Sequence, residues 1–143
     1  RIHVAGDFFS LPYMHAWYTV AMLNPSVLFY AYTKSLRFWV GGINELPILH
    51  NFVLTASYGG RDDHMIDEFN LRSTKVVYSE AIAAVLGLDI DHDDSHAAKP
   101  SLRDQDFALL IHGTQPAGSQ ASVALKELKG KGSYSRKKLQ VSA

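Results

Sequence analysis

Short apolar runs alternate with helix-like segments along this chain, and that order predicts an α/β protein. The apolar runs 2–5, 27–32, 52–56, 75–78 and 107–111 are expected to be strands. The segments 11–23, 36–49, 62–69, 80–86 and 121–129 are expected to be helices, the second of them interrupted by glycines and a proline. Because the strand runs are continuously apolar, we expect strands that are buried on both faces, in a mostly parallel sheet.

About five βα units of this kind fit either a partial (β/α)8-type barrel or a small doubly wound domain. We expect one α/β domain over residues 1–130 and a basic C-terminal tail over residues 131–143. Residues 87–106 are expected to form one long irregular loop. Arg1 directly adjoins the first predicted strand, which favours a barrel-derived fragment or a chain trimmed at its front. The open parallel edges of such a sheet invite pairing, so we expect a homo-oligomer.

The first helix has the clearest start and stop signals. Ser10 can cap its N-terminus, and Asn24 with Pro25 ends it. Helical spacing predicts that it buries one apolar stripe, made by Tyr13, Ala16, Trp17, Val20 and Leu23.

Composition excludes several classes of function. The 143 residues contain no cysteine, so this chain offers no disulfide, thiolate zinc ligand, cluster ligand or cysteine nucleophile. Lysine plus arginine and aspartate plus glutamate both total 14, which argues against nucleic acid as a partner. No apolar run reaches the roughly 18 residues that a membrane span needs, so we expect no membrane partner and a cytoplasmic location.

Polar residues or glycines follow all five predicted strands, where parallel α/β sheets bind their ligands. We take Asp7, Lys34 and His112 as candidate catalytic residues, with Gly6 and Ser57 as ligand-binding neighbours. A carboxylate at the position of Asp7 could act as a general base or bind an amine, a hydroxyl or a metal. The alternatives are that Asp7 caps the first helix or pairs with Lys34, and that these ends are polar only because loops are polar.

The loop after the fifth strand carries glycines before a helix, a pattern typical of anion binding through backbone N–H groups. Its candidate ligand-binding residues are Gly113, Thr114, Gly118 and Ser119. The two glycines have the spacing of a P-loop, but Ser119 replaces the phosphate-binding lysine, which argues against nucleotide hydrolysis by that mechanism. The alternative is a plain turn in which Ser119 caps the helix.

A second candidate site lies in the acidic segment 91–96. His92 and His96 have a spacing that would face one metal ion on a helix, with Asp93 as a third ligand. The alternative is an exposed acidic loop, which could also close over a ligand held at the strand ends. No cofactor follows from these residues.

The segments 3–10 and 30–36, together with Trp17, resemble the uncharacterised phage family called gene product eighty-eight. The segments 51–60 and 112–122 are similar to its marine cyanophage branch. Family members carry an N-terminal cysteine-rich segment that is reminiscent of radical S-adenosylmethionine proteins. In that analogy, residues 5–7 would meet the methionyl amine. This chain lacks the cysteine segment and its cluster ligands.

Together these features predict a phage-type protein of unknown function that binds a small anionic or nucleotide-like ligand at the strand ends. The alternative is a non-enzymatic phage accessory protein that binds a host or phage macromolecule, or that forms a homo-oligomer. The basic tail and the open sheet edge motivate that alternative.

Overall fold

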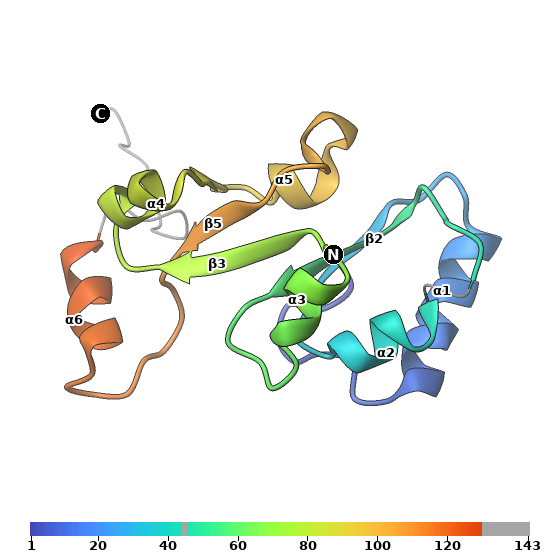
Figure 1. Ribbon diagram of the computed structural model, residues 1–143, viewed down its shortest axis with the longest axis horizontal. Helices are drawn as coiled ribbons and strands as arrows, with labels where there is room; N and C mark the ends of the chain where they lie inside the picture. Colours follow the sequence, from blue (N-terminus) through green and yellow to red (C-terminus); the bar gives the residue numbers. More distant parts are fainter. Residues whose placement is uncertain (44–45, 130–143) are drawn as a thin grey trace, which may run out of the picture. The chain divides into compact units, whose positions relative to one another are not determined.

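The computed structural model describes residues 1–43 and 46–129 and has an α/β fold. Its elements in chain order, most of them labelled in Figure 1, are α1 (Leu11–Leu23), β1 (Phe29–Thr33), α2 (Leu36–Val40), β2 (Phe52–Ser57), α3 (His64–Glu68), β3 (Ser73–Val77), α4 (Glu80–Leu86), β4 (Asp89–Ile90), α5 (Ser95–Ala98), the 3-10 helix η2 (Pro100–Leu102), β5 (Phe107–Leu110) and α6 (Gln120–Glu127). The strand order is β1-β2-β3-β5-β4. The strands run parallel, and β1 and β4 are edges, so the described strands form an open sheet and no closed barrel. The predicted α/β class with a parallel sheet is therefore confirmed.

The chain forms two compact units. The first contains residues 1–75 and 95–106, and the second contains residues 76–94 and the described residues from 107 on. Strand β3 begins in the first unit and ends in the second. The predicted basic tail over 131–143 lies outside the described residues.

The predicted first strand, residues 2–5, is wrong: this segment is irregular, and β1 begins at Phe29. One backbone hydrogen bond, from Ile2 N to Tyr30 O at 2.9 Å, ties the segment to β1. Val4 exposes 90% of its surface, so its side chain gains nothing from burial in a sheet. We call residues 1–9 the N-terminal arm. The fifth strand comes instead from β4, inside the predicted irregular loop, which also contains α5 and η2.

Helix α1 has the predicted ends but buries a different face. The Ser10 hydroxyl accepts a hydrogen bond from Tyr13 N, and Asn24 is the C-cap. The fully buried residues are Met14, Tyr18 and Ala21, whereas Ala16, Val20 and Leu23 of the predicted stripe are exposed. Because apolar residues lie on every side of this helix, the sequence pattern could not choose the buried face.

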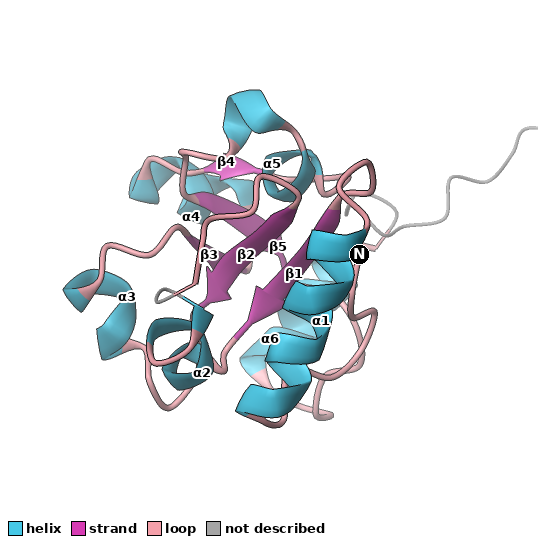
Figure 2. Cartoon of the chain, turned by 90° about the vertical axis from the view of Figure 1, so that its right-hand side faces the viewer, coloured by secondary structure: helices cyan, strands magenta, loops and turns pink. Residues whose placement is uncertain are grey.

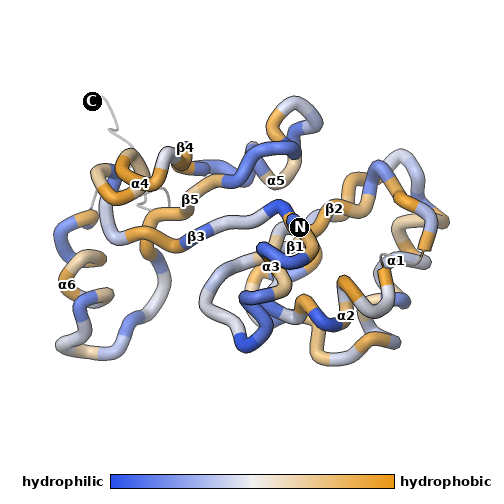
Figure 3. Tube along the Cα trace, viewed as in Figure 1, coloured by the Kyte–Doolittle hydropathy of each residue, from blue (hydrophilic) through white to orange (hydrophobic). Residues whose placement is uncertain are grey.

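The larger of two hydrophobic clusters in the first unit lies between α1 and the strands β1 and β2 (Figure 2), and the other is built from Leu36, Ala56, Ile66 and Leu71. Strand β2 is hydrophobic over most of its length, as Figure 3 shows, and is buried from Phe52 to Ala56. Buried Asn51 anchors the end of α1 to this sheet, because its side-chain amide donates to the carbonyls of Ala21, Asn24 and Val27 at 2.9–3.0 Å. These contacts hold the C-terminal end of α1 and the turn that follows it beside the start of β2.

Helix α2 ends at Val40, well short of the predicted end at residue 49. Gly41 caps it, and Gly42 follows where α1 approaches closely: a Cβ at Gly42 would overlap Leu11 and lie 2.8 Å from Phe38 O. The two glycines thus end the helix and allow the close approach.

The second unit has a separate core built from Val77, Ala83, Ala108 and Leu110. Helix α4 occupies the predicted residues, with the Ser79 hydroxyl accepting from Ile82 N and with Gly87 left-handed at its C-cap. No helix in the described part of the chain is long and apolar enough to cross a membrane.

Candidate functional site

The N-terminal arm is held at the C-terminal end of β1 by Asp7. Its Oδ1 accepts hydrogen bonds from Phe8 N and from the Thr33 hydroxyl, both at 2.7 Å, and its Oδ2 accepts from Lys34 N at 2.7 Å. Gly6, with φ of +85°, turns the arm into this position, in a conformation that favours glycine. Asp7 therefore lies at the end of β1, which it reaches from an irregular arm, and not at the end of a strand of its own as predicted.

A second pair of hydrogen bonds continues this connection. The Ser35 hydroxyl donates to Phe8 O at 2.6 Å, and the Thr33 hydroxyl accepts from Ser35 N at 3.0 Å. Phe8 is almost fully buried in the core of the first unit. Asp7, Phe8, Thr33 and Ser35 form what we call the arm latch, which joins residues 7–8 to residues 33–35.

The Lys34 ammonium group spans from β1 to the end of β2. It donates to the Ser57 carbonyl at 3.2 Å, to the Ser57 hydroxyl at 3.1 Å and to the carbonyl of Tyr58. Burial lowers the pKa of Lys34 below its ordinary 10.5, while the carboxylates of Asp63 and Asp7 act in the opposite direction. The structure thus joins Asp7, Lys34 and Ser57, three of the residues predicted for one site.

Asp63 shapes the loop that follows β2. Its two carboxylate oxygens accept from Gly59 N and Gly60 N, both at 2.8 Å. Gly59 has φ of +96°, and a Cβ there would lie 3.3 Å from Lys34 Nζ. The loop can therefore pass close to Lys34 only because both positions are glycine.

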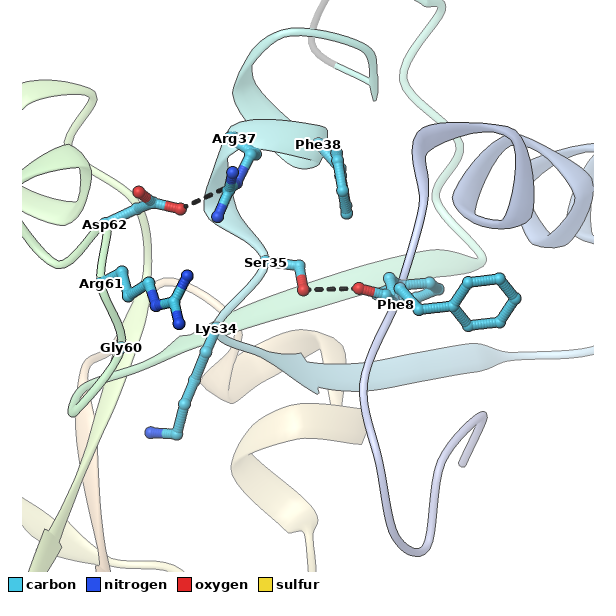
Figure 4. Close-up of a pocket in the computed structure, with 9 residues that line it drawn as sticks. Phe8, Lys34, Ser35, Arg37, Phe38, Gly60, Arg61 and Asp62 are labelled. Atoms are coloured by element: carbon cyan, nitrogen blue, oxygen red, sulfur yellow. Dashed lines mark hydrogen bonds and ion pairs between the residues drawn. The ribbon is translucent and has the colours of Figure 1, made fainter.

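An open pocket of about 440 Å³ lies beside this network (Figure 4). Its lining combines aromatic rings with three cationic side chains: Phe8, Phe9, Lys34, Ser35, Arg37, Phe38, Gly60, Arg61 and Asp62. Figure 4 shows the guanidinium groups of Arg37 and Arg61 on one side, Phe38 and Phe8 on the other, and Lys34 extending away from the arginines.

The two arginines differ in their partners. Arg37 Nε lies 3.3 Å from Asp62 Oδ2, in an ion pair that is partly exposed. Arg61 is exposed and makes no ion pair within the described residues. The pocket thus presents one uncompensated guanidinium and one that shares a carboxylate.

Sequence reasoning missed Arg37, Arg61 and Asp63 at this site, and it noted Thr33 and Ser35 as polar residues at a strand end without choosing them as site residues. Thr33 and Ser35 flank Lys34 at a strand end and could have been included with it on that ground. The fork made by Asp63 has a short-range signal, because the carboxylate follows two glycines by three residues. Nothing in the sequence indicates that Arg37 and Arg61, 24 positions apart, line one pocket.

The predicted glycine loop lies in the second unit. His112 Nδ1 is 2.8 Å from Leu110 O, and Gln115 donates to His112 O at 2.8 Å. Gly113 and Gly118 have φ of +73° and +78°. The Ser119 hydroxyl accepts from Ser122 N, so Ser119 is the N-cap of α6, which was the alternative reading of this residue. Gly113, Thr114 and Gly118 are exposed and stay predicted ligand-binding residues.

The structure offers no support for the predicted metal site. Helix α5 begins at Ser95 and has four residues, so His92 precedes it and does not share a helical face with His96. His92 and Asp93 are exposed, whereas His96 is buried. The described residues contain no group of three or more His, Cys, Asp or Glu side chains that could hold a metal ion.

An iron–sulfur cluster of the kind suggested by the radical S-adenosylmethionine analogy does not fit these residues. Such clusters are held mainly by Cys thiolates, and the 143 residues contain none. Asp7, which the analogy would place against a methionyl amine, has its carboxylate engaged by three hydrogen bonds in the arm latch.

Comparison with known proteins identifies a family but no characterised relative. No curated protein and no solved structure matches the chain. The model of the family described as Gene product 88 matches residues 1–130. With this match over nearly the whole chain, and with the arm and strand-end motifs now placed at one site, the chain belongs to the phage family Gene product 88.

Proposed function

We propose that this phage gene product binds a small anionic ligand in the pocket at the C-terminal ends of β1 and β2. The observation that carries the proposal is Arg61, an exposed guanidinium without an ion-pair partner among the described residues, lining a pocket together with Arg37. A pocket volume of about 440 Å³ is within the range of small-ligand sites. Guanidinium groups match phosphate and carboxylate geometry because their N–H donors form a planar fork.

In this proposal, Arg61 and Arg37 contact the anion and the Ser35 hydroxyl lies beside them. Asp7 and Lys34 act as positioning residues, because their polar atoms hold the arm and the end of β2 in place. Asp62 competes with the ligand for Arg37. A ligand that displaces this carboxylate would gain a second guanidinium contact.

The test is titration of the full chain with inorganic phosphate, followed by amide chemical shifts. We expect shifts clustered at the pocket residues, and a loss of most of the affinity in Arg61→Gln. Lys99→Gln is the matched control, because Lys99 is an exposed cation elsewhere in the first unit. The absence of chemical shift changes, or an equal loss of affinity in both variants, would contradict a specific site.

The same titration examines the loop 113–119. If that loop also binds anions through its backbone N–H groups, shifts at Gly113, Thr114 and Gly118 should saturate independently of Arg61. His112, whose ring is engaged with Leu110 O, would then orient this loop. Equal shifts in a buffer of matched ionic strength without phosphate would remove this second site.

A homo-oligomer is a second candidate role, favoured by an edge strand and an apolar helix surface. Strand β1 is an edge of the sheet, and α1 exposes Val20 and Leu23 at 40% and 70%. Light scattering across a range of concentrations should then show a mass above that of one chain, and Leu23→Glu should reduce it. A single-chain mass at every concentration would exclude this role.

For a phage protein, we expect the host cytoplasm as the place of action, which fractionation of infected cells would test.

A further inference from the structure

Phe9, in the N-terminal arm, is an exposed aromatic residue with a fixed orientation. It exposes 76% of its surface, although its ring stacks on Tyr13 with centroids 4.5 Å apart and an interplanar angle of 20°. Tyr13 is held in turn, because its hydroxyl lies 3.3 Å from His3 Nε2 and its backbone N–H donates to the Ser10 cap. One face of the Phe9 ring is therefore supported from behind, and the large exposed fraction leaves the rest of the ring to solvent.

The arm latch fixes the base of this aromatic pair. The neighbouring residue, Phe8, is nearly fully buried, and its carbonyl accepts the hydrogen bond from Ser35. Phe9 consequently extends from an anchored backbone, so little conformational entropy is lost when a planar group stacks on it.

Phe9 and Arg61 line the same pocket. A supported aromatic face and one uncompensated guanidinium in the lining of the same pocket suit a ligand that has a planar ring at one end and an anionic group at the other. Bases stack on aromatic side chains regardless of sequence because every base has a π-face. Phosphate is one of the two anions, with carboxylate, that an arginine guanidinium binds through two parallel hydrogen bonds, and it is the one that a nucleotide carries.

We infer that the ligand of this pocket is a nucleoside monophosphate, with its phosphate on Arg61 and its base stacked on Phe9. The inference rests on the proposed anion site and adds the class of ligand. Phe9 is the specificity residue, because it distinguishes a nucleotide from a simple phosphate ester. The Arg37 guanidinium also binds the phosphate once its ion pair with Asp62 is broken.

The experiment compares adenosine monophosphate with ribose 5-phosphate by calorimetry, using the full chain. Wild type should bind adenosine monophosphate about tenfold more tightly, the factor expected from one base–aromatic stack. Phe9→Leu should reduce this preference to about twofold without changing the affinity for ribose 5-phosphate. Phe9→Tyr should retain the preference because it keeps the ring.

Two further variants serve as controls. Phe69→Leu removes another partly exposed aromatic ring of the first unit, at the end of α3, and should leave both affinities unchanged. Arg61→Gln should weaken both ligands alike, because both carry the phosphate.

The outcomes separate the two proposals. Equal binding of both ligands that depends on Arg61, with no effect of Phe9→Leu, overturns the nucleotide inference and leaves the anion site. Binding of neither ligand overturns the anion site itself. An affinity for oligoadenylates that rises with their length would also overturn the inference, because it would assign the surface to a nucleic acid strand.

Discussion

The Thr33 hydroxyl donates a 2.7 Å hydrogen bond to Oδ1 of Asp7, across 26 positions of sequence. The same hydroxyl oxygen accepts from Ser35 N, so one buried side chain joins the arm to the end of β1 and to the turn that follows. The pocket wall formed by Phe8 and Phe9 depends on this latch, because the latch holds the arm to the end of β1 directly at residues 7 and 8, whereas the backbone hydrogen bond of the arm to β1 lies at Ile2.

Removing the Thr33 hydroxyl should therefore destabilise the first unit. Thr33→Val keeps the shape but leaves the Ser35 N–H and one Asp7 lone pair without their partner, which should lower the free energy of unfolding by about 1–3 kcal/mol. Urea unfolding measures this value. Thr19→Val, on the exposed side of α1, should change it by about 0.5 kcal/mol or less. A loss at Thr33 no larger than at Thr19 would contradict the latch.

The face that α1 buries can be tested with two methionines on this helix. Met14 is fully buried and Met22 is 52% exposed. We expect Met14→Ala to lower the free energy of unfolding by about 2–5 kcal/mol, since it leaves a cavity, and Met22→Ala to change it by about 0.5 kcal/mol. Similar losses in the two variants would mean that α1 buries another face.

Adjacent carboxylates in the loop after β2 should differ in their effect on stability. Asp63→Ala removes the acceptor for Gly59 N and Gly60 N and should lower the free energy of unfolding by about 1–3 kcal/mol. Asp62→Ala breaks only a partly exposed ion pair with Arg37 and should have an effect of about 1 kcal/mol or less. Denaturant titration of both variants provides the comparison, and the reverse order would contradict the role of Asp63.

Removing the charge of Asp62 should strengthen the binding of phosphate. Asp62→Asn removes the negative charge beside Arg37 and should tighten phosphate binding about threefold to tenfold. Calorimetry at low salt measures the change. Asp104→Asn, at an exposed carboxylate elsewhere in the first unit, should leave the affinity unaltered. Weaker binding in Asp62→Asn would place the anion away from Arg37.

The lowered pKa of Lys34 predicts a dependence of stability on pH. Between that lowered pKa and 10.5, the unfolded chain keeps a proton that the folded chain has lost, so this group makes the free energy of unfolding rise with pH. The free energy of unfolding of wild type minus that of Lys34→Met should therefore become more positive from pH 8 to pH 10. Lys99→Met should leave the difference constant. A difference that shrinks with pH would show that the pKa of Lys34 is raised instead.

Local signals account for the elements that were predicted well. The first helix was correctly bounded by Ser10 and Asn24, because capping depends on side chains within a few positions of the helix end. The same holds for α4, which begins after Ser79 and ends before Gly87. Strand β2 was recognised because its continuous apolar run reflects burial on both faces.

The sequence by itself determined the α/β class, most of the helices and strands, and the presence of polar residues at the ends of β1 and β2. Only the tertiary structure decided that residues 2–5 belong to an irregular arm, that Met14 rather than Val20 is buried, and that Arg37 and Arg61 line one pocket. The physical reason is the separation along the sequence over which each interaction acts. Apolar periodicity and caps are set by near neighbours in the chain, whereas a latch from Asp7 to Thr33 forms only after distant segments have packed together.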